Sequence, residues 1–147
     1  MTEIRPIAAA DHDAWRELFR AYGVFYETHF SDEVFDGVWT WLMDATHAVS
    51  ALVADDGGKV VGFAHIRKLH DTFTAGPAWF LDDLYVAPDH RGQGVARALI
   101  ERGYADGTAA GGGTFRWITA ADNETAQVLY DRIATRAGWI VYEKELG

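Results

Sequence analysis

The chain has 147 residues, no cysteine and a net charge of −9 at pH 7. Its length predicts one domain, residues 1–147, and the missing cysteines exclude disulfides and a cysteinyl acyl-enzyme. The acidic balance argues against nucleic acid as a partner, and the apolar runs are too short to cross a membrane. An N-terminus without the layout of a signal peptide favours a cytoplasmic protein.

The first half of the chain predicts a strand, two helices and a hairpin. Asp11 and Ser31 are candidate N-cap residues for the helices, and Asp55-Asp56-Gly57-Gly58 is typical of a tight turn between two strands. In chain order the expected elements are a strand at Thr2–Pro6, a helix from Asp11 to Tyr26, a helix after Ser31 that carries Val34 to Leu42, and strands at Ala48–Ala54 and Lys59–Leu69.

The second half predicts alternating strands and helices. Ala87-Pro88 stops a long strand, and Gly138 is the expected end of the last helix. The elements are a strand at Ala78–Val86, a helix at Gly92–Asp106, a strand at Thr114–Thr119, a helix from Asn123 to Ala137, and a closing strand at Trp139–Leu146. The order β-α-α-β-β-β-α-β-α-β predicts an α/β domain with a mixed sheet of about six strands and four helices.

A glycine-rich turn, Arg91-Gly92-Gln93-Gly94, leads from the strand that ends at Val86 directly into a helix. Such a turn presents unpaired backbone N–H groups at the positive end of a helix dipole, and a pyrophosphate fits there because glycine has no Cβ. Arg97 stands where a dinucleotide fingerprint has its third glycine, and there is no P-loop. A lone turn of this kind is also common as a purely structural feature.

Two motifs in this order resemble those of the GNAT acetyltransferases. Arg91-x-x-Gly94-x-Ala96 is similar to the family's pyrophosphate motif, and Asn123-x-x-Ala126-x-x-Leu129-Tyr130 is similar to its last helix. The resemblance extends over the whole chain, although seven residues separate Tyr130 from Gly138-Trp139, four more than in the family's usual ending. That longer ending looks most like the branch of diamine, polyamine and lysine-type amine acetyltransferases.

The resemblance implies acetyl-CoA as co-substrate and direct attack by an amine. It implies that pantetheine amides pair with the backbone of Leu84–Val86, that the Val86 N–H stabilises an oxyanion, and that Tyr130 is the general acid. Spacing alone would make Tyr130 an ordinary aromatic of the helix stripe. The coenzyme-binding residues implied by the resemblance are Leu84, Tyr85, Val86, Arg91, Gly92, Gln93, Gly94, Val95, Ala96, Arg97, Asn123 and Tyr130.

Two adjacent acids, Asp82 and Asp83, are the candidates for handling the proton of the amine. Side chains alternate across a strand, so we expect only one of them to line the site. The resemblance favours Asp82, as both catalytic and substrate-binding residue, and the other acid is then structural. It also implies an acceptor groove that includes Tyr26, Glu27, Trp79 and Phe80.

The segment from Ala21 to Gly58 has no Lys or Arg, and its acids either steer a cation or form a solvated face. Scattered histidines predict no metal site, with His65 structural and His90 facing solvent. The predicted function is acetyl transfer to a small cationic amine through a ternary complex. The alternatives are acetylation of a protein lysine or N-terminus, and a non-catalytic acyl-CoA-binding module. The resemblance implies a homodimer. The acids of the segment are Glu27, Asp32, Glu33, Asp36, Asp44, Asp55 and Asp56.

Overall fold

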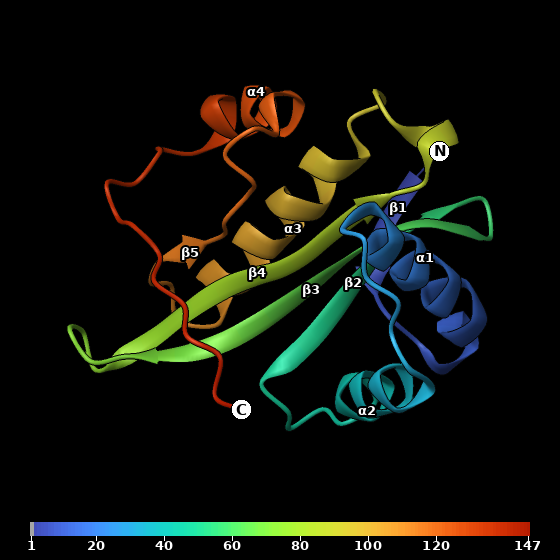
Figure 1. Cartoon of the computed structure of the whole chain (residues 1–147), viewed down its shortest axis with the longest axis horizontal. Coiled ribbons are helices and arrows are strands. Elements are labelled where there is room, and N and C mark those ends of the chain that lie inside the picture. The colour runs from blue at the N-terminus through green and yellow to red at the C-terminus, as the bar shows by residue number, and fades with distance from the viewer. Residues whose placement is uncertain (1) are drawn as a thin grey trace. The chain divides into compact units, whose positions relative to one another are not determined.

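Five strands form one mixed sheet in the order β1-β2-β3-β4-β5 in the computed structural model, which describes residues 2–147 (Figure 1). The first three pairings are antiparallel, and β4 and β5 run parallel. A parallel neighbour requires a crossover, which the helix between these two strands supplies. The strands are β1 (Thr2–Pro6), β2 (Val49–Asp56), β3 (Lys59–Asp71), β4 (Gly76–Val86) and β5 (Phe115–Arg116).

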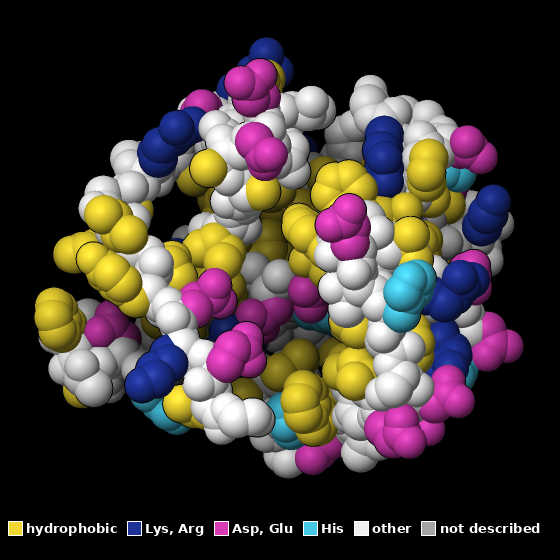
Figure 2. All heavy atoms as spheres, in the orientation of Figure 1, with side chains coloured by type: hydrophobic (Ala, Val, Ile, Leu, Met, Phe, Trp, Pro, Cys, Tyr) yellow, Lys and Arg dark blue, Asp and Glu magenta, His cyan; other side chains and the backbone are white. Residues whose placement is uncertain are grey.

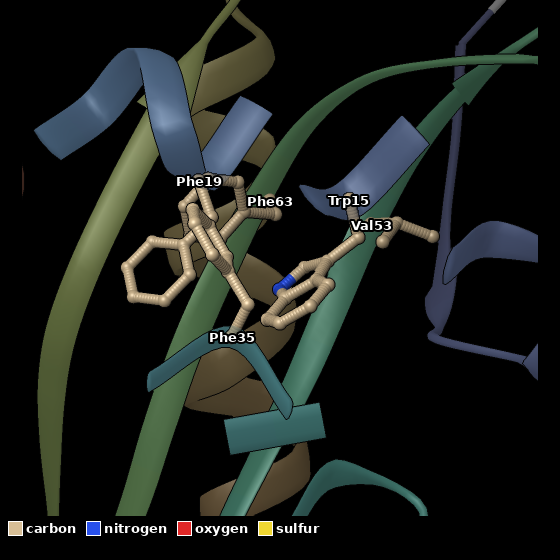
Figure 3. Close-up of a cluster of buried hydrophobic side chains, with 5 residues drawn as sticks. All are labelled: Trp15, Phe19, Phe35, Val53 and Phe63. Carbon is tan, nitrogen blue, oxygen red and sulfur yellow. The ribbon is translucent and has the colours of Figure 1, made fainter. Parts of the chain in front are cut away.

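Two helices, α1 (His12–Phe25) and α2 (Asp32–Leu42), pack on one face of the sheet. Their aromatic side chains meet those of the central strands, and Figure 3 shows this cluster. Phe63 and Trp15 are fully buried in it. Edge-to-face and tilted ring contacts join the cluster, which is the arrangement that aromatic quadrupoles favour. Its buried members are Trp15, Phe19, Phe35, Val53 and Phe63.

The opposite face of the sheet is covered by α3 (Val95–Ala109). Here small residues allow close packing: a Cβ built on Gly103 would lie 3.0 Å from the Phe115 ring and 3.1 Å from the side chain of Ile66. Leu99 and Ile100 are buried between the helix and the sheet. The two faces therefore differ, with large aromatic rings under α1 and α2 and tight helix-to-sheet contact under α3.

The order of these elements agrees with the sequence analysis, with shifted ends. Ser31 caps α2 by accepting a hydrogen bond from the Val34 N–H. Asp11 is the N-cap residue of α1, but its side chain makes no capping bond to that helix. It ends a short 3₁₀ turn (Ala9–Asp11), and its carboxylate accepts from the Arg5 guanidinium and the Ala8 N–H. The hairpin turn between β2 and β3 is confirmed, because Gly57 and Gly58 both have positive φ.

The chain clusters into two units, one through Trp117 and one from Ile118 to Gly147. The second unit contains α4 (Glu124–Ile133), which begins where Asn123 Oδ1 accepts from the Ala126 N–H. The predicted closing strand at Trp139–Leu146 is wrong, since this segment is not paired as a strand and its apolar side chains are exposed. The sheet of the described residues thus has five strands, and within residues 2–147 no helix is long and apolar enough to cross a membrane.

Candidate active site

The strand β4 has an open edge toward its C-terminal end. β5 pairs with it only at Trp79 and Phe80, although the sequence predicted a longer strand there. The Ala87 N–H donates to the Val61 carbonyl of β3. Because successive N–H groups of a strand point to opposite edges, those of Val86 and Leu84 point away from β3. Two backbone donors therefore face the edge from which β5 has diverged.

The glycine turn lies directly after this edge. Gly92 and Gly94 have φ values of 76° and 81°, a backbone conformation that glycine adopts without steric cost. A Cβ built on either would meet nothing within 4 Å, so the space above the turn is open. The first backbone bond of α3 runs from Ala98 to Gly94, which leaves the preceding N–H groups available at the positive end of the helix. The turn fits the pyrophosphate of a coenzyme.

The remaining side chains of the turn hold it against the sheet. Arg91 donates through Nε to the Val86 carbonyl at 2.9 Å, and its guanidinium lies over the Tyr85 ring. His90 lies 3.1 Å from Asp56 of β2 and is only 19% exposed, so the prediction that it faces solvent is wrong. Arg91 therefore links the turn to β4, and His90 links it to the hairpin.

Both acids of β4 lie on the α1/α2 face of the sheet, contrary to the expectation that they alternate. The register shifts there, so that His65 pairs with Asp83 while Ile66 pairs with Leu81, and Asp82 is the extra residue of a β-bulge. The extra residue of a bulge interrupts the alternation, so two consecutive side chains point to the same face. Asp82 and Asp83 consequently bond to Arg67 and His65, which lie two residues apart on one face of β3.

The two acids differ in their partners. Asp82 is held bidentately by Arg67, at 2.9 and 3.0 Å, and this ion pair raises the pKa of Arg67. Asp83 accepts from neutral donors, His65 Nδ1 at 2.8 Å and the Tyr22 hydroxyl. Burial, and after it the Asp83 charge, raises the pKa of Tyr22 above its usual value. Asp83 therefore bonds to no Lys or Arg side chain within residues 2–147, whereas the charge of Asp82 is neutralised by Arg67.

The expected acceptor residues are divided between the two faces. Phe80 lies on the α1/α2 face under the Arg67 guanidinium, at 5.2 Å. Trp79 lies on the other face, against Gly107 of α3, and donates through Nε1 to the Gly112 carbonyl. It lines a depression of about 220 Å³ beside the C-terminal half of α3. Trp79 is thus removed from any groove that contains the two acids.

The end of α1 lies near Asp83. Tyr26 is about half exposed, and its ring lies 4.9 Å from that of Tyr22, the residue that bonds Asp83. Glu27 ends the helix with a φ of 57°, which is uncommon for a residue other than glycine. The contacts that Tyr22, His65 and Arg67 make with the two acids were not predicted from the sequence. Their proximity depends on the packing of α1 and on the register of β3, neither of which leaves a local motif.

In the second unit, Tyr130 lies in the last turn but one of α4. Asn123, expected to contact the coenzyme, uses its side-chain oxygen to cap this helix. Its amide nitrogen remains a donor. The Asn123-x-x-Ala126 spacing is therefore first of all a helix-start signal, with Ala126 supplying the capped N–H.

The acidic segment between Ala21 and Gly58 does not form one continuous acidic surface. Figure 2 shows acidic and basic side chains interspersed over the region of α1 and α2. Asp32 pairs with Arg16, and Asp55 with Arg5. Some of this negative charge therefore serves local structure.

Comparison with known proteins agrees with this geometry. The model of the acetyltransferase (GNAT) family matches residues 12–134. The chain belongs to the GNAT family. It is 29% identical to the D-amino-acid N-acetyltransferase HPA3 of Saccharomyces cerevisiae, over 96% of this chain and 89% of the yeast protein. It is 36% identical to an aminoglycoside N(6')-acetyltransferase of Stenotrophomonas maltophilia, over 66% of this chain and 61% of that one.

Solved structures of this GNAT fold align over the whole chain. A ribosomal-protein-alanine N-acetyltransferase from Brucella melitensis biovar Abortus 2308 aligns with a TM-score of 0.82 and 26% identity, each chain being fully covered. The aminoglycoside N-acetyltransferase AAC(6')-Iy in complex with CoA has a TM-score of 0.84 and 21% identity, covering 100% of this chain and 96% of that one. These likenesses support the fold, and the relatives do not single out the diamine branch.

This GNAT protein is therefore an acetyl-CoA-dependent N-acyltransferase. The open edge of β4 and the glycine turn are the parts of the described chain that suit the coenzyme. Residues 2–147 contain no group of three or more His, Asp or Glu side chains placed to hold a metal ion.

Proposed function

We propose that this enzyme transfers an acetyl group directly from acetyl-CoA to the primary amine of a small cationic acceptor, within a ternary complex. Diamines, polyamines, lysine-like amines and aminoglycosides belong to this class. The observation that carries the proposal is Asp83, a carboxylate with neutral hydrogen-bond partners on the face next to the open edge of β4. An ammonium group is the natural occupant of such a position, since a close ion pair there gains about 1–4 kcal/mol.

The coenzyme supplies an activated acetyl thioester, and backbone groups of this chain hold it. The N–H groups of Leu84 and Val86 would pair with pantetheine as an added strand does. The Val86 N–H would donate to the thioester oxygen, where charge develops. The N–H groups between Gly92 and Val95 would receive the pyrophosphate. Arg91 and Gln93 would complete the coenzyme contacts around the turn, with Ala96 and Arg97 on the first turn of α3.

Proton transfer limits what Asp83 can do. An amine near pKa 10.4 and a carboxyl near 3.9 differ by about 9 kcal/mol, so an ordinary aspartate is a poor base for an ammonium. Asp83 would bind the cation and orient it while the proton leaves to water. Asp82, which the resemblance favoured, would act through its ion pair with Arg67.

Tyr130 would donate a proton to the departing thiolate. Tyrosine near pKa 10 and a thiol near 8.5 differ by only about 2 kcal/mol. A hydrogen bond that strengthens as charge builds on sulfur is therefore sufficient. The support for this role is the family motif that Tyr130 completes.

An amino acid is the second candidate acceptor. Arg67 lies two residues from His65 on β3, so a guanidinium and the Asp83 carboxylate share one face of the sheet. That pairing of charges suits an ammonium and a carboxylate on one small molecule. One relative, which aligns with this chain over 89% of its own length, is a D-amino-acid N-acetyltransferase. Arg67 is already paired with Asp82, which favours the cationic acceptor as the first candidate.

We also propose a cytoplasmic homodimer. Support for the dimer comes from the segment after Gly138, where Trp139, Ile140 and Tyr142 are all at least 79% exposed. Large apolar side chains in such a row are typical of a contact surface. Sedimentation equilibrium should give twice the chain mass, and a chain ending at Gly138 should sediment as a monomer. A monomeric intact protein would contradict the dimer.

The acceptor is tested by thiol release from acetyl-CoA with a panel of amines. The panel contains putrescine, spermidine, an aminoglycoside, D- and L-alanine and a lysine peptide. We expect the multiply charged small amines to give the highest kcat/KM, and their KM to rise with salt, because a Debye length of about 10 Å at 0.1 M screens exposed charges. A preference for D-alanine would establish the second candidate. Coenzyme binding without thiol release for any amine would identify a non-catalytic binder and refute the proposal.

A further inference from the structure

A chain of polar groups crosses the aromatic core and ends at Asp83. It begins at Trp15 of α1, whose indole Nε1 lies 2.9 Å from His65 Nε2. The other ring nitrogen of His65, Nδ1, lies 2.8 Å from Asp83 Oδ2. Trp15 is fully buried and His65 is 2% exposed. These three side chains come from α1, β3 and β4, so the packing of the sheet against α1 is what assembles them.

The chemistry of the donors fixes the proton on His65. An indole N–H can only donate, so His65 Nε2 must be the acceptor and carries no hydrogen. In the neutral imidazole the proton is then on Nδ1, which donates to the Asp83 carboxylate. A second proton on Nε2 would set two N–H groups against each other in a buried place, which leaves both without an acceptor.

The surroundings of His65 reinforce this state. The rings of Phe19 and Phe63 lie 4.8 and 4.7 Å from the imidazole and exclude water from it. Its neighbour on β2 is Ala51, which does not titrate. The titratable and charged groups facing the His65 cluster are Asp83 and Asp82 from β4, Tyr22, Tyr26 and His12 from α1, and Arg67 further along the same face of β3.

We propose that Trp15 and His65 are positioning residues, which act through one hydrogen-bond chain to hold the Asp83 carboxylate in place for the acceptor amine. The inference rests on the proposed function, in which Asp83 binds the ammonium group. Oδ2 of Asp83 is occupied by a neutral donor, so the negative charge remains for the substrate. The proton that leaves the amine does not pass to His65, because Trp15 occupies the nitrogen that would receive it.

The first test determines the state of His65 by long-range ¹H–¹⁵N correlation spectra of histidine-labelled protein between pH 5 and 8.5. In the native protein His65 should show the Nδ1–H tautomer. In Trp15→Phe, Nε2 loses its indole donor, so the ¹⁵N signals of His65 should no longer be those of a single Nδ1–H tautomer. Trp39→Phe is the matched control, because Trp39 packs on Trp15 from α2 at 5.2 Å. It should leave the His65 signals unchanged.

The second test measures kinetics. Trp15→Phe should raise the amine KM above that of the native enzyme, because an imidazole that the indole no longer fixes holds the Asp83 carboxylate less well. The KM for acetyl-CoA should not change. His65→Leu should raise the amine KM about ten- to a hundredfold at every pH, the scale of one lost hydrogen bond to a charged group. His65→Gln keeps an acceptor for Trp15 and a donor for Asp83, and should restore the native KM.

The outcomes separate this inference from the proposed function. An active native enzyme whose His65 carries its proton on Nε2 would overturn the inference alone. Equal effects of His65→Leu and His65→Gln on the amine KM would also overturn it. A native protein with the Nδ1–H tautomer that acetylates no amine would instead refute the proposed function. If Trp15→Phe does not fold, the native spectra and the two His65 variants decide the question.

Discussion

Two regions of the strand β4 differ in the groups that they present, backbone in one and side chains in the other. The C-terminal part of β4 and the turn after it present backbone groups: the N–H groups of Leu84 and Val86, and those at the start of α3. The middle of β4 presents side chains, Asp82 and Asp83, whose state depends on residues from α1 and β3. The proposed coenzyme half of the site therefore depends on chain conformation, and the proposed acceptor half on which side chains meet.

This difference has consequences for substitution. A backbone site tolerates most changes of side chain but not a change that alters φ or fills the space above a glycine. A side-chain site tolerates local backbone variation but loses its function when one charge or one partner is removed. The predictions below test the backbone half and the side-chain half separately.

The largest effect on stability should come from Gly113, in the turn that leads into β5. Its φ is 99°, and an added Cβ would overlap the Pro77 carbonyl oxygen, so neither conformation nor space permits a side chain. We expect Gly113→Ala to lower the free energy of unfolding by more than about 4 kcal/mol. Gly112→Ala is the control, with a φ of 72° and open space, and should cost about 1–2 kcal/mol. Urea denaturation measures both, and equal losses would contradict the packing of this turn.

Tyr130→Phe should have the largest effect on turnover. It keeps the ring and removes the hydroxyl, so kcat should fall by about 10²–10⁴, the range for a lost general acid. The KM for acetyl-CoA should change little. Stopped-flow measurement of thiol release gives the chemical step. An unchanged rate for that step would show that Tyr130 only packs.

Gly94→Val should abolish coenzyme binding. The native protein should gain about 2.7 kcal/mol of stability at a hundredfold excess of CoA over its Kd. In the variant the Cβ branches occupy the open space over the turn. Gly57→Val is the matched control, because Gly57 also has a positive φ and open space but lies in the β2–β3 turn. Thermal melts with and without CoA should show a shift for Gly57→Val and none for Gly94→Val.

The glycine turn and the strand before it could be predicted from the sequence better than the surroundings of the two acids, for the same physical reason. The turn and its helix are encoded within one short stretch, so Gly92, Gly94 and the strand that ends at Val86 could be read without a structure. Most element positions followed from helical periodicity and turn residues. The short β5 and the unpaired segment Trp139–Leu146 could not be predicted in this way. A strand-like pattern does not show which neighbouring strand, if any, a segment will pair with.

The acceptor half required knowledge of register. Strict alternation along β4 predicted that Asp82 and Asp83 point to opposite faces of the sheet. The bulge that brings both to one face arises from the pairing of β4 with β3. Trp79 and Phe80 were expected together in a groove, yet alternation sends them to opposite faces of the sheet. The partner of Asp83, His65, lies 18 residues earlier in the chain and belongs to no motif.

The acids of the N-terminal segments should contribute to stability more than to substrate binding. The Arg5 guanidinium holds the pKa of Asp11 below its usual value, so this contribution is complete above about pH 4, the unfolded value. It is lost as pH falls further through the folded pKa. Asp11→Asn should cost about 2 kcal/mol at pH 7 and flatten the fall in stability below pH 4. Asp44→Asn, at an exposed turn where hydrogen bonds from Thr46 also lower the pKa of the carboxyl, should flatten that fall less than Asp11→Asn does. Denaturation between pH 2.5 and 7 compares the two variants, and identical curves would contradict the role of Asp11.

The central claim is that the acceptor half is organised around the charge of Asp83, and its most direct test compares two neighbouring substitutions. Asp83→Asn and Asp82→Asn each remove one charge from the same face of β4, and the KM values for amine and for acetyl-CoA are measured in both. We predict that Asp83→Asn raises the amine KM about ten- to a hundredfold, the loss of one interaction with a charged group. Asp82→Asn should raise it only a few-fold, because its charge is already compensated by Arg67. Neither should change the KM for acetyl-CoA, and an amine KM that rises more in Asp82→Asn than in Asp83→Asn would contradict the account.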